Sequence, residues 1–200
     1  MKHKSIVFFV TIMVMFYIIR VSNLNDNTYF PDETIYNIGE EVELNEDFFN
    51  TSTENSDGYT LKVIDSEIYS IDDFIVKYNV KNNNIKCFDY VYVVKANFKN
   101  ISNDKIGEVG INLSHYILQE TSYITLMEND ILSIVNNFDQ NSFSLYLNSE
   151  KEIMIPFAIS KKGIDIERLI NGKLQLVVSL YPNKKVIKLD SPKLIQDKMT

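Results

Sequence analysis

An apolar run near the amino terminus constrains this chain more than any other feature. Residues 6–19 contain a single polar residue, a threonine; Lys2 and Lys4 precede the run, and Arg20 follows it. The first acidic residue is Asp26. A cationic flank followed by an apolar run is typical of a secretory signal or an uncleaved membrane anchor whose amino terminus stays in the cytosol. We therefore expect the remainder of the chain to lie outside the cell.

The length of this run leaves three interpretations open. As a helix it would be about 21 Å long, whereas the hydrocarbon core of a bilayer is about 30 Å thick. It is short for a membrane span, but long for the apolar part of a signal peptide, which has about 7–15 residues. No Ala-x-Ala-like cleavage site occurs at 20–24, and no cysteine follows the run for lipid attachment. We favour a signal-anchor helix over residues 1–22. A cleaved signal is the main alternative, and a buried helix of a soluble protein is the third.

The charge of the remaining chain excludes some classes of partner. Removing Lys2, Lys4 and Arg20 from the 20 basic residues leaves 17 against 27 acidic ones, a net charge of about −10 after the leader. Nucleic-acid binding needs a basic patch, and anionic lipid surfaces attract basic segments. We therefore expect no nucleic-acid partner, and contact with the membrane only through the amino-terminal helix.

Cysteine usage limits how the domain is stabilised. Cys87 is the single cysteine, so an intramolecular disulfide is impossible and packing alone must hold the fold. Because it directly precedes an apolar strand, we expect Cys87 to be a partly buried, unreactive side chain.

The distribution of turn-forming and polar residues divides the chain. Residues 23–38 are polar and rich in turn formers, which is typical of a linker. Residues 39–190 carry the apolar alternation of a folded domain, and residues 191–200 form a polar tail that we expect to be flexible.

Most of the domain has the period-two pattern of β-strands. The clearest strand is 88–99, in which Tyr90, Tyr92, Val94, Ala96 and Phe98 share one apolar face. In 59–69 the apolar phase slips by one residue near Val63 and Ile64, which predicts a β-bulge. Pro156 predicts that the strand at 153–159 lies at a sheet edge or a bulge. Further strands are predicted at 40–44, 111–118, 123–127, 143–147, 173–181 and 185–189, whereas 131–135 is too short to classify.

Helical signals are few. Ser70 and Asp73 have the spacing of a capping box, and Ile71, Phe74, Ile75 and Tyr78 then form one apolar stripe. Residues 163–172 fit a single helical turn. The sequence therefore predicts an all-β fold, an immunoglobulin-like antiparallel β-sandwich with one or two short helices, preceded by an amino-terminal transmembrane helix.

Four segments carry a family resemblance: GEEVEL at 39–44, DGYTLKV at 57–63, YVYVVKANFKN at 90–100 and VSLYPNKK at 178–185. Together with the leader, they resemble an uncharacterised family of Gram-positive bacterial proteins, known only as a domain of unknown function. Its members are membrane-anchored or secreted and have an immunoglobulin-like extracellular domain. The resemblance covers roughly residues 36–190 and implies no activity and no catalytic residue.

The residues themselves predict no catalytic, cofactor-binding or metal-binding site. His115 is the only histidine after the leader, no Gly-x-Ser-x-Gly elbow accompanies it, and the glycines are too dispersed for a phosphate-binding loop. A zinc site would have only Cys87 and His115 as soft ligands. Two chemical alternatives stay open: a carboxylate pair among Glu40/Glu41, Glu46/Asp47 and Asp72/Asp73, and calcium binding by the acidic loop 45–58.

Tyrosine is abundant, with twelve residues in the chain. Tyr90 and Tyr92 belong to the predicted core, but Tyr59, Tyr69, Tyr116 and Tyr181 are candidates for a partly exposed binding surface. We predict a non-enzymatic, surface-tethered module that recognises a protein or cell-envelope component. The alternatives are an envelope hydrolase using a carboxylate pair, or a calcium-responsive sensor. The cell membrane is the expected location, with secretion as the alternative, and the oligomeric state is open.

Overall fold

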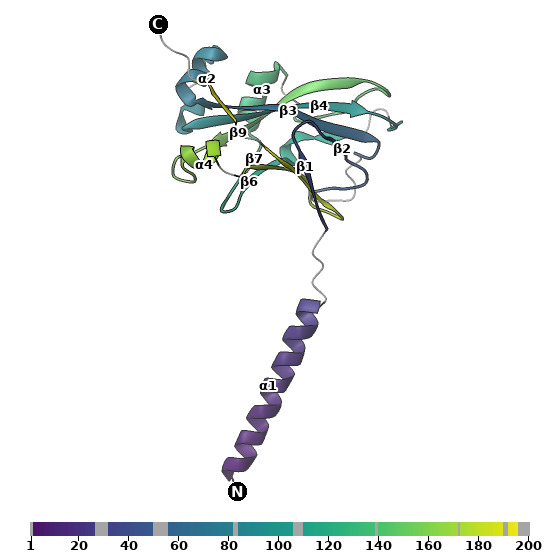
Figure 1. The fold of residues 1–200 in the computed structure, drawn as a ribbon, viewed down its shortest axis with the longest axis vertical. Helices are drawn as coiled ribbons and strands as arrows, with labels where there is room; N and C mark the ends of the chain where they lie inside the picture. Colours follow the sequence, from purple (N-terminus) through teal and green to yellow (C-terminus); the bar gives the residue numbers. More distant parts are fainter. Residues whose placement is uncertain are drawn as a thin grey trace. The chain divides into compact units, whose positions relative to one another are not determined.

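A computed structural model describes residues 2–26, 32–49, 56–81, 84–105, 110–138, 140–171, 173–189 and 192–195 (Figure 1). The chain divides into two compact units, Met1–Pro31 and Asp32–Thr200. The first unit contains helix α1, and the second contains the strands and the shorter helices.

Helix α1 spans Lys2–Asp26 and includes the whole apolar run. A helix therefore forms where one was expected. No helix in the described part of the chain has both the length and the apolar character needed to cross a membrane. The transmembrane character predicted for residues 1–22 is therefore not confirmed.

The second unit is built on two five-stranded sheets (Figure 1). In sheet A the strands follow one another in the order β1 (Glu33–Asn37), β11 (Lys184–Lys188), β10 (Gln175–Ser179), β6 (Ile117–Glu120) and β7 (Tyr123–Leu126). Sheet B has the order β12 (Lys193–Ile195), β3 (Tyr59–Ser70), β4 (Tyr90–Asn100) and β9 (Glu150–Ile159), and β2 (Glu41–Glu43) also pairs with β3. A small separate sheet joins β5 (Ile111–Asn112) to β8 (Ser142–Phe143).

The main hydrophobic core draws on both large sheets, as expected for a β-sandwich. Alternate residues of each strand point into it. Sheet A contributes Leu118, Leu176, Val178 and Ile187; sheet B contributes Leu61, Val63, Ile68, Tyr92, Val94, Ala96, Phe98, Ile153, Ile155, Phe157 and Ile159. The predicted core face of β4 is confirmed, and the hydroxyl of Tyr92 donates to Ser66 Oγ at 3.0 Å inside this core.

The opposite face of sheet B is also buried, at one end of the sheet. Helices α2 (Ile71–Lys77) and α3 (Asn129–Asn136) pack there and form a second apolar cluster with Val91 and Val93 (Figure 1). The β4 strand is therefore apolar on both faces over part of its length, which is why its second face has a mixed sequence pattern.

The predicted cap of α2 is confirmed. The amide of Asp73 donates to Ser70 Oγ at 3.1 Å, and the Ser70 hydroxyl donates to Asp73 Oδ2 at 2.6 Å. The predicted turn within 163–172 forms helix α4 (Ile166–Asn171). With α3, the described part of the domain has three short α-helices instead of one or two, and 3-10 turns η1 (Asn84–Cys87) and η2 (Leu113–His115) add to them.

Two predictions of local irregularity are confirmed. The pairing of β3 with β4 shifts register between Val63 and Asp65, so Ile64 is the extra residue of a bulge and is exposed. Strand β9, which contains Pro156, ends the strand order of sheet B, where a residue without an amide proton is tolerated.

Other boundaries differ from the sequence expectation. Strand β1 lies inside the expected linker 23–38, and β12 lies inside the expected flexible tail 191–200. Both pair in parallel, β1 with β11 and β12 with β3, so the sheets are mixed and not wholly antiparallel. The strand expected at 143–147 is reduced to Ser142–Phe143, and η2 divides the one expected at 111–118.

Candidate functional site

Three segments meet at the end of sheet B where β3 begins and β4 ends. We call residues 56–58, 100–105 and 144–149 the loop tip. The amides of Ile101 and Ser102 donate to the carbonyl of Gly58 at 2.8 and 3.2 Å, and the amide of Asn148 donates to the carbonyl of Asn100 at 2.9 Å. These bonds continue the sheet pairing into the loops, so the three segments are held next to one another.

The side chain of Asn100 fixes the centre of the loop tip. It is fully buried, and its amide group donates to the carbonyls of Asn103 and Leu145, each at 2.8 Å. Its Oδ1 accepts from the Asn103 amide at 2.8 Å. Asn103 is also buried, and its side chain donates to the Asp57 carbonyl at 2.6 Å. Two asparagines therefore satisfy backbone groups on all three segments, which makes the loop conformation specific.

A tyrosine and two glycines complete this framework. The Tyr59 hydroxyl accepts from the Leu145 amide at 3.1 Å and is 3.5 Å from its carbonyl oxygen. Gly58 has φ +81°, and a Cβ atom there would lie 2.5 Å from the Asn103 amide nitrogen. A Cβ atom on Gly110 would lie 2.7 Å from the Tyr59 ring. Both positions need glycine for the loops to approach this closely.

The loop tip presents apolar side chains to solvent. The exposed fractions are 75% for Tyr146, 50% for Leu147 and 43% for Ile101. Because the backbone of these loops is already ordered, covering the side chains with a partner costs little further backbone entropy. This arrangement is suited to binding a partner.

The tyrosines predicted to form a binding surface are more buried than expected. Tyr59, Tyr69 and Tyr116 are buried, so the expectation that they are partly exposed is wrong; Tyr181 is exposed, as expected. The buried tyrosines pack within apolar clusters, where a hydroxyl can still find a partner.

The two candidate reactive residues, Cys87 and His115, lie in different elements. Cys87 is exposed at the end of η1, so the expectation of partial burial is wrong. His115 is half-buried in η2, with Nε2 3.3 Å from Asn112 Nδ2 and its ring centroid 5.8 Å from that of Phe49. Within the described ranges, no group of three or more His, Cys, Asp or Glu side chains is placed to hold a metal ion. Residues 50–55 of the candidate calcium loop 45–58 lie outside the described residues.

Each candidate carboxylate pair has at least one member that is engaged by a local partner. Glu41 accepts from the Thr60 hydroxyl at 2.7 Å, Asp73 caps α2, and Asp47 forms an ion pair with Lys185. Hydrogen bonds from the amide and side chain of Asn37 lower the pKa of Glu40. A general acid in a glycosidase needs a raised pKa instead.

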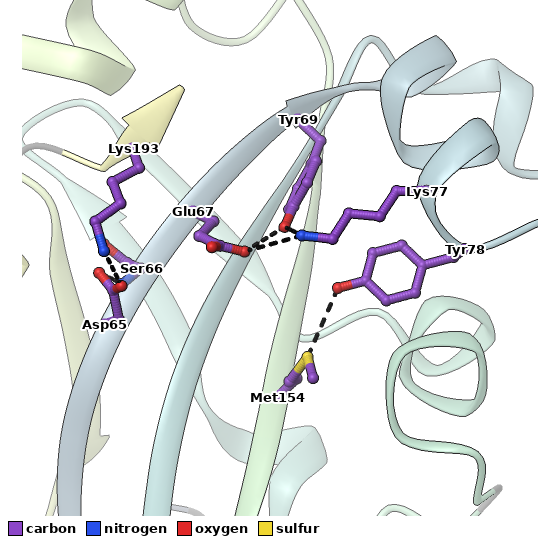
Figure 2. Close-up of polar contacts among 8 residues, drawn as sticks. All are labelled: Asp65, Ser66, Glu67, Tyr69, Lys77, Tyr78, Met154 and Lys193. Carbon is purple, nitrogen blue, oxygen red and sulfur yellow. Dashed lines mark hydrogen bonds and ion pairs between the residues drawn. The ribbon is translucent and has the colours of Figure 1, made fainter. Parts of the chain in front are cut away.

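A polar cluster lies on the outer face of sheet B beside α2 (Figure 2). The Tyr69 hydroxyl donates to Glu67 and accepts from Lys77, and Lys77 Nζ is 3.5 Å from Glu67 Oε2. The Tyr78 hydroxyl is 3.7 Å from Met154 Sδ. Burial, followed by the bond to Glu67, raises the pKa of Tyr69. The phenol therefore stays protonated at neutral pH and stabilises the junction of β3 and α2.

The comparisons with known proteins place this chain in a family. The model of a family described as Domain of unknown function (DUF5028) matches residues 33–185, which is more than half of the chain. The chain belongs to this family. Comparison with curated proteins and with solved structures gave no match. The expected membership of an uncharacterised family is confirmed, and the DUF5028 domain begins at β1, inside the expected linker.

Sequence reasoning missed the residues that build the loop tip of the DUF5028 domain. The sequence pattern assigns no role to Asn100 and Asn103, and it places Leu147 in the strand predicted at 143–147. The spacing of two asparagines at i and i+3 after a strong strand is the available signal, because an asparagine side chain can bond to backbone groups a few residues away. Nothing in the sequence indicates that Asn100 also reaches Leu145, forty-five positions later.

Proposed function

We propose that this protein is an exported, non-catalytic recognition module that binds a protein or a cell-envelope component through its loop tip. The observation that carries the proposal is the exposure of Tyr146, Leu147 and Ile101 on loops fixed by the buried Asn100 and Asn103. Such a surface combines contact area with pre-organisation, and both favour binding.

The position of the loop tip supports this reading. Immunoglobulin-like domains bind through loops gathered at one end of two stacked sheets. We propose that the two-sheet domain of this chain is used in the same way, with Tyr146 as the central contact. Tyrosine is favoured at such positions because it offers a large surface with few rotatable bonds.

The amino-terminal residues support the export part of the proposal. The apolar run 6–19, preceded by Lys2 and Lys4, has the order of charges of a signal sequence, and its length lies at the upper end of the range for the apolar part of one. Fractionation of cells that express the full chain, with and without detergent, tests this. We expect the protein in the membrane or secreted fraction, and amino-terminal sequencing will show whether the leader is kept. Full-length protein free in the cytosol would refute export.

The binding test compares two pairs of exposed apolar residues. The full chain, a Tyr146→Ser/Leu147→Ser variant and an Ile124→Ser/Leu126→Ser control are incubated with isolated cell envelopes, and the bound fraction is measured against protein concentration. Ile124 and Leu126 are exposed to a similar extent but lie on β7. We expect the loop-tip variant to bind about ten-fold more weakly and the control to bind like the unmodified chain. Equal binding of all three proteins would refute the proposed surface.

A further inference from the structure

The edge of β3 that faces away from β4 is shared by two short strands. Strand β2 pairs antiparallel with Thr60–Lys62, and β12 pairs in parallel with the other end, Lys193 opposite Glu67 and Ile195 opposite Tyr69. The bulge between Val63 and Asp65 separates the two pairings. Among the described residues, the edge Glu67–Tyr69 is therefore covered by β12, which lies outside the DUF5028 domain.

Within the part of the chain that the structure describes, few side-chain contacts hold β12 on this edge. Lys193 pairs with Asp65 (Figure 2), but the two side chains are 65% and 36% exposed, and an exposed ion pair contributes little. The Leu194 side chain is 38% exposed. Ile195 packs partly against the cluster that contains Tyr69 and Phe74. Pro192, directly before the strand, is also buried. Among the described residues of β12 itself, Ile195 is the one that packs on an apolar cluster, and so short a strand can be displaced at low cost.

The contacts of β12 define the chemistry that the edge accepts. Side chains two positions apart on a strand lie on the same face, so Lys193 and Ile195 both point to the outer face of sheet B. There the cation meets Asp65, and the aliphatic group meets the apolar cluster beside α2. Main-chain bonds to a sheet edge provide affinity for an extended segment, and pockets for alternate side chains provide specificity.

We propose that the Glu67–Tyr69 edge is an acceptor site for an extended segment of a partner protein, and that β12 is a resident strand which this segment displaces. The segment adds in parallel to β3 and carries a cationic side chain followed, two residues later, by an aliphatic one. A second copy of this chain offers only the same contacts as β12. It would also have to compete with a tethered strand, whose effective concentration is roughly 10⁻³ M. A partner with a longer or more apolar segment can exceed that.

The test uses the full chain with its own strand disfavoured. In the variant Lys193→Glu/Ile195→Asp, the new carboxylates face Asp65 and the apolar cluster, so β12 should leave the edge. The probe is a fluorescent peptide with the sequence of residues 191–197, and its binding is followed by anisotropy. We expect the variant to bind the peptide at least about ten-fold more tightly than the unmodified chain, in which the tethered strand competes. A peptide with Lys193→Glu should not bind the variant, but should bind when Asp65→Lys is added.

Three outcomes would overturn the proposal. One is a variant with an unchanged circular dichroism spectrum that binds neither peptide. Another is equal binding of the two peptides. The third is a dimer of the unmodified chain, seen by light scattering and abolished in the variant, because it would assign the edge to a second copy.

A measurement on the unmodified chain keeps the proposal testable if the variant fails to fold. The amides of β12 that donate to β3 should exchange with deuterium at least about ten-fold faster than the paired amides of β4, because a weakly held strand opens locally. Equal protection of the two strands would contradict a displaceable β12.

Discussion

Asp47 and Lys185 form a buried ion pair that connects segments far apart in the sequence. Lys185 Nζ lies 2.5 Å from Asp47 Oδ2 and also donates to the carbonyl of Glu43. Asp47 Oδ1 accepts from the amide and the side chain of Asn183 at 3.3 and 3.0 Å. The pair thus fastens the segment after β2 to the turn between β10 and β11. Removing one partner would leave an uncompensated charge inside the protein.

We predict that Lys185→Met lowers the free energy of unfolding by about 3–5 kcal/mol, because Asp47 then stays buried without its cation. Urea denaturation followed by circular dichroism measures this. Lys184→Met is the matched control: its partner Glu33 is well exposed, so the expected loss is about 0–1 kcal/mol. Similar losses in both variants would show that the buried pair has no special role.

The Asn100 side chain should contribute strongly to the loop tip. Asn100→Ala removes three hydrogen bonds and leaves buried backbone groups unpaired, so we expect a loss of about 2–4 kcal/mol in the free energy of unfolding. Asn97→Ala is the control, because that side chain makes an exposed bond to Glu150 and should cost less than about 1 kcal/mol. The same urea titration compares them, and equal effects would contradict a structural role for the Asn100 network.

The ion pair between Glu120 and Arg168 should make stability depend on pH. Their side chains are 2.6 Å apart, and the hydrogen bond from Arg168 lowers the pKa of Glu120. The folded state therefore holds this proton less tightly than the unfolded state, so the contribution is complete above a pH of about 4.3 and is lost as pH falls through the folded pKa. Glu120→Gln should flatten the decline in unfolding free energy below that pH, as measured by urea titrations at several pH values. An unchanged slope would contradict the assignment.

Among the elements, strands β3 and β4 were the most predictable. The alternation of Tyr92, Val94 and Ala96 fixes which face of β4 is buried, and the phase slip at Ile64 locates the bulge in β3. These predictions succeed because burial on one face of a strand imposes a period of two on the sequence.

The bulge gives a prediction for adjacent residues of β3. Val63 is fully buried in the main core, whereas Ile64 is exposed. Val63→Ala should lower the free energy of unfolding by about 2 kcal/mol through lost packing, and Ile64→Ala should change it by no more than about 0.5 kcal/mol. Urea denaturation of the two variants gives the comparison. A larger loss for Ile64→Ala would mean that β3 has a different register.

Other elements lacked a local signal. Strands β1 and β12 are short and mostly exposed, and their partners β11 and β3 are distant in sequence, so their pairing depends on the assembled sheet edges. Helix α3 has only two turns, and its apolar residues Ile131 and Leu132 fit a strand or a helix equally. The loop tip depends in the same way on contacts made after folding, such as that between Asn100 and Leu145.

At the scale of the whole molecule, the described core residues all belong to the second unit. All members of the three apolar clusters lie between Tyr36 and Ile195, so the described core is complete without α1. The chain has one cysteine and cannot add a disulfide. Stability of the second unit must therefore come from the two sheets and the helices that cover sheet B.

We therefore predict that deleting residues 1–31 leaves the unfolding transition of the domain unchanged, because none of the clustered core residues belongs to Met1–Pro31. The urea midpoint of the shortened protein, followed by circular dichroism, should equal that of the full chain. Deletion of residues 190–200 is the matched comparison at the other end: it removes β12 and the packing of Ile195 on the second cluster, so the midpoint should fall. A lower midpoint after the amino-terminal deletion would mean that α1 contributes to the folded domain.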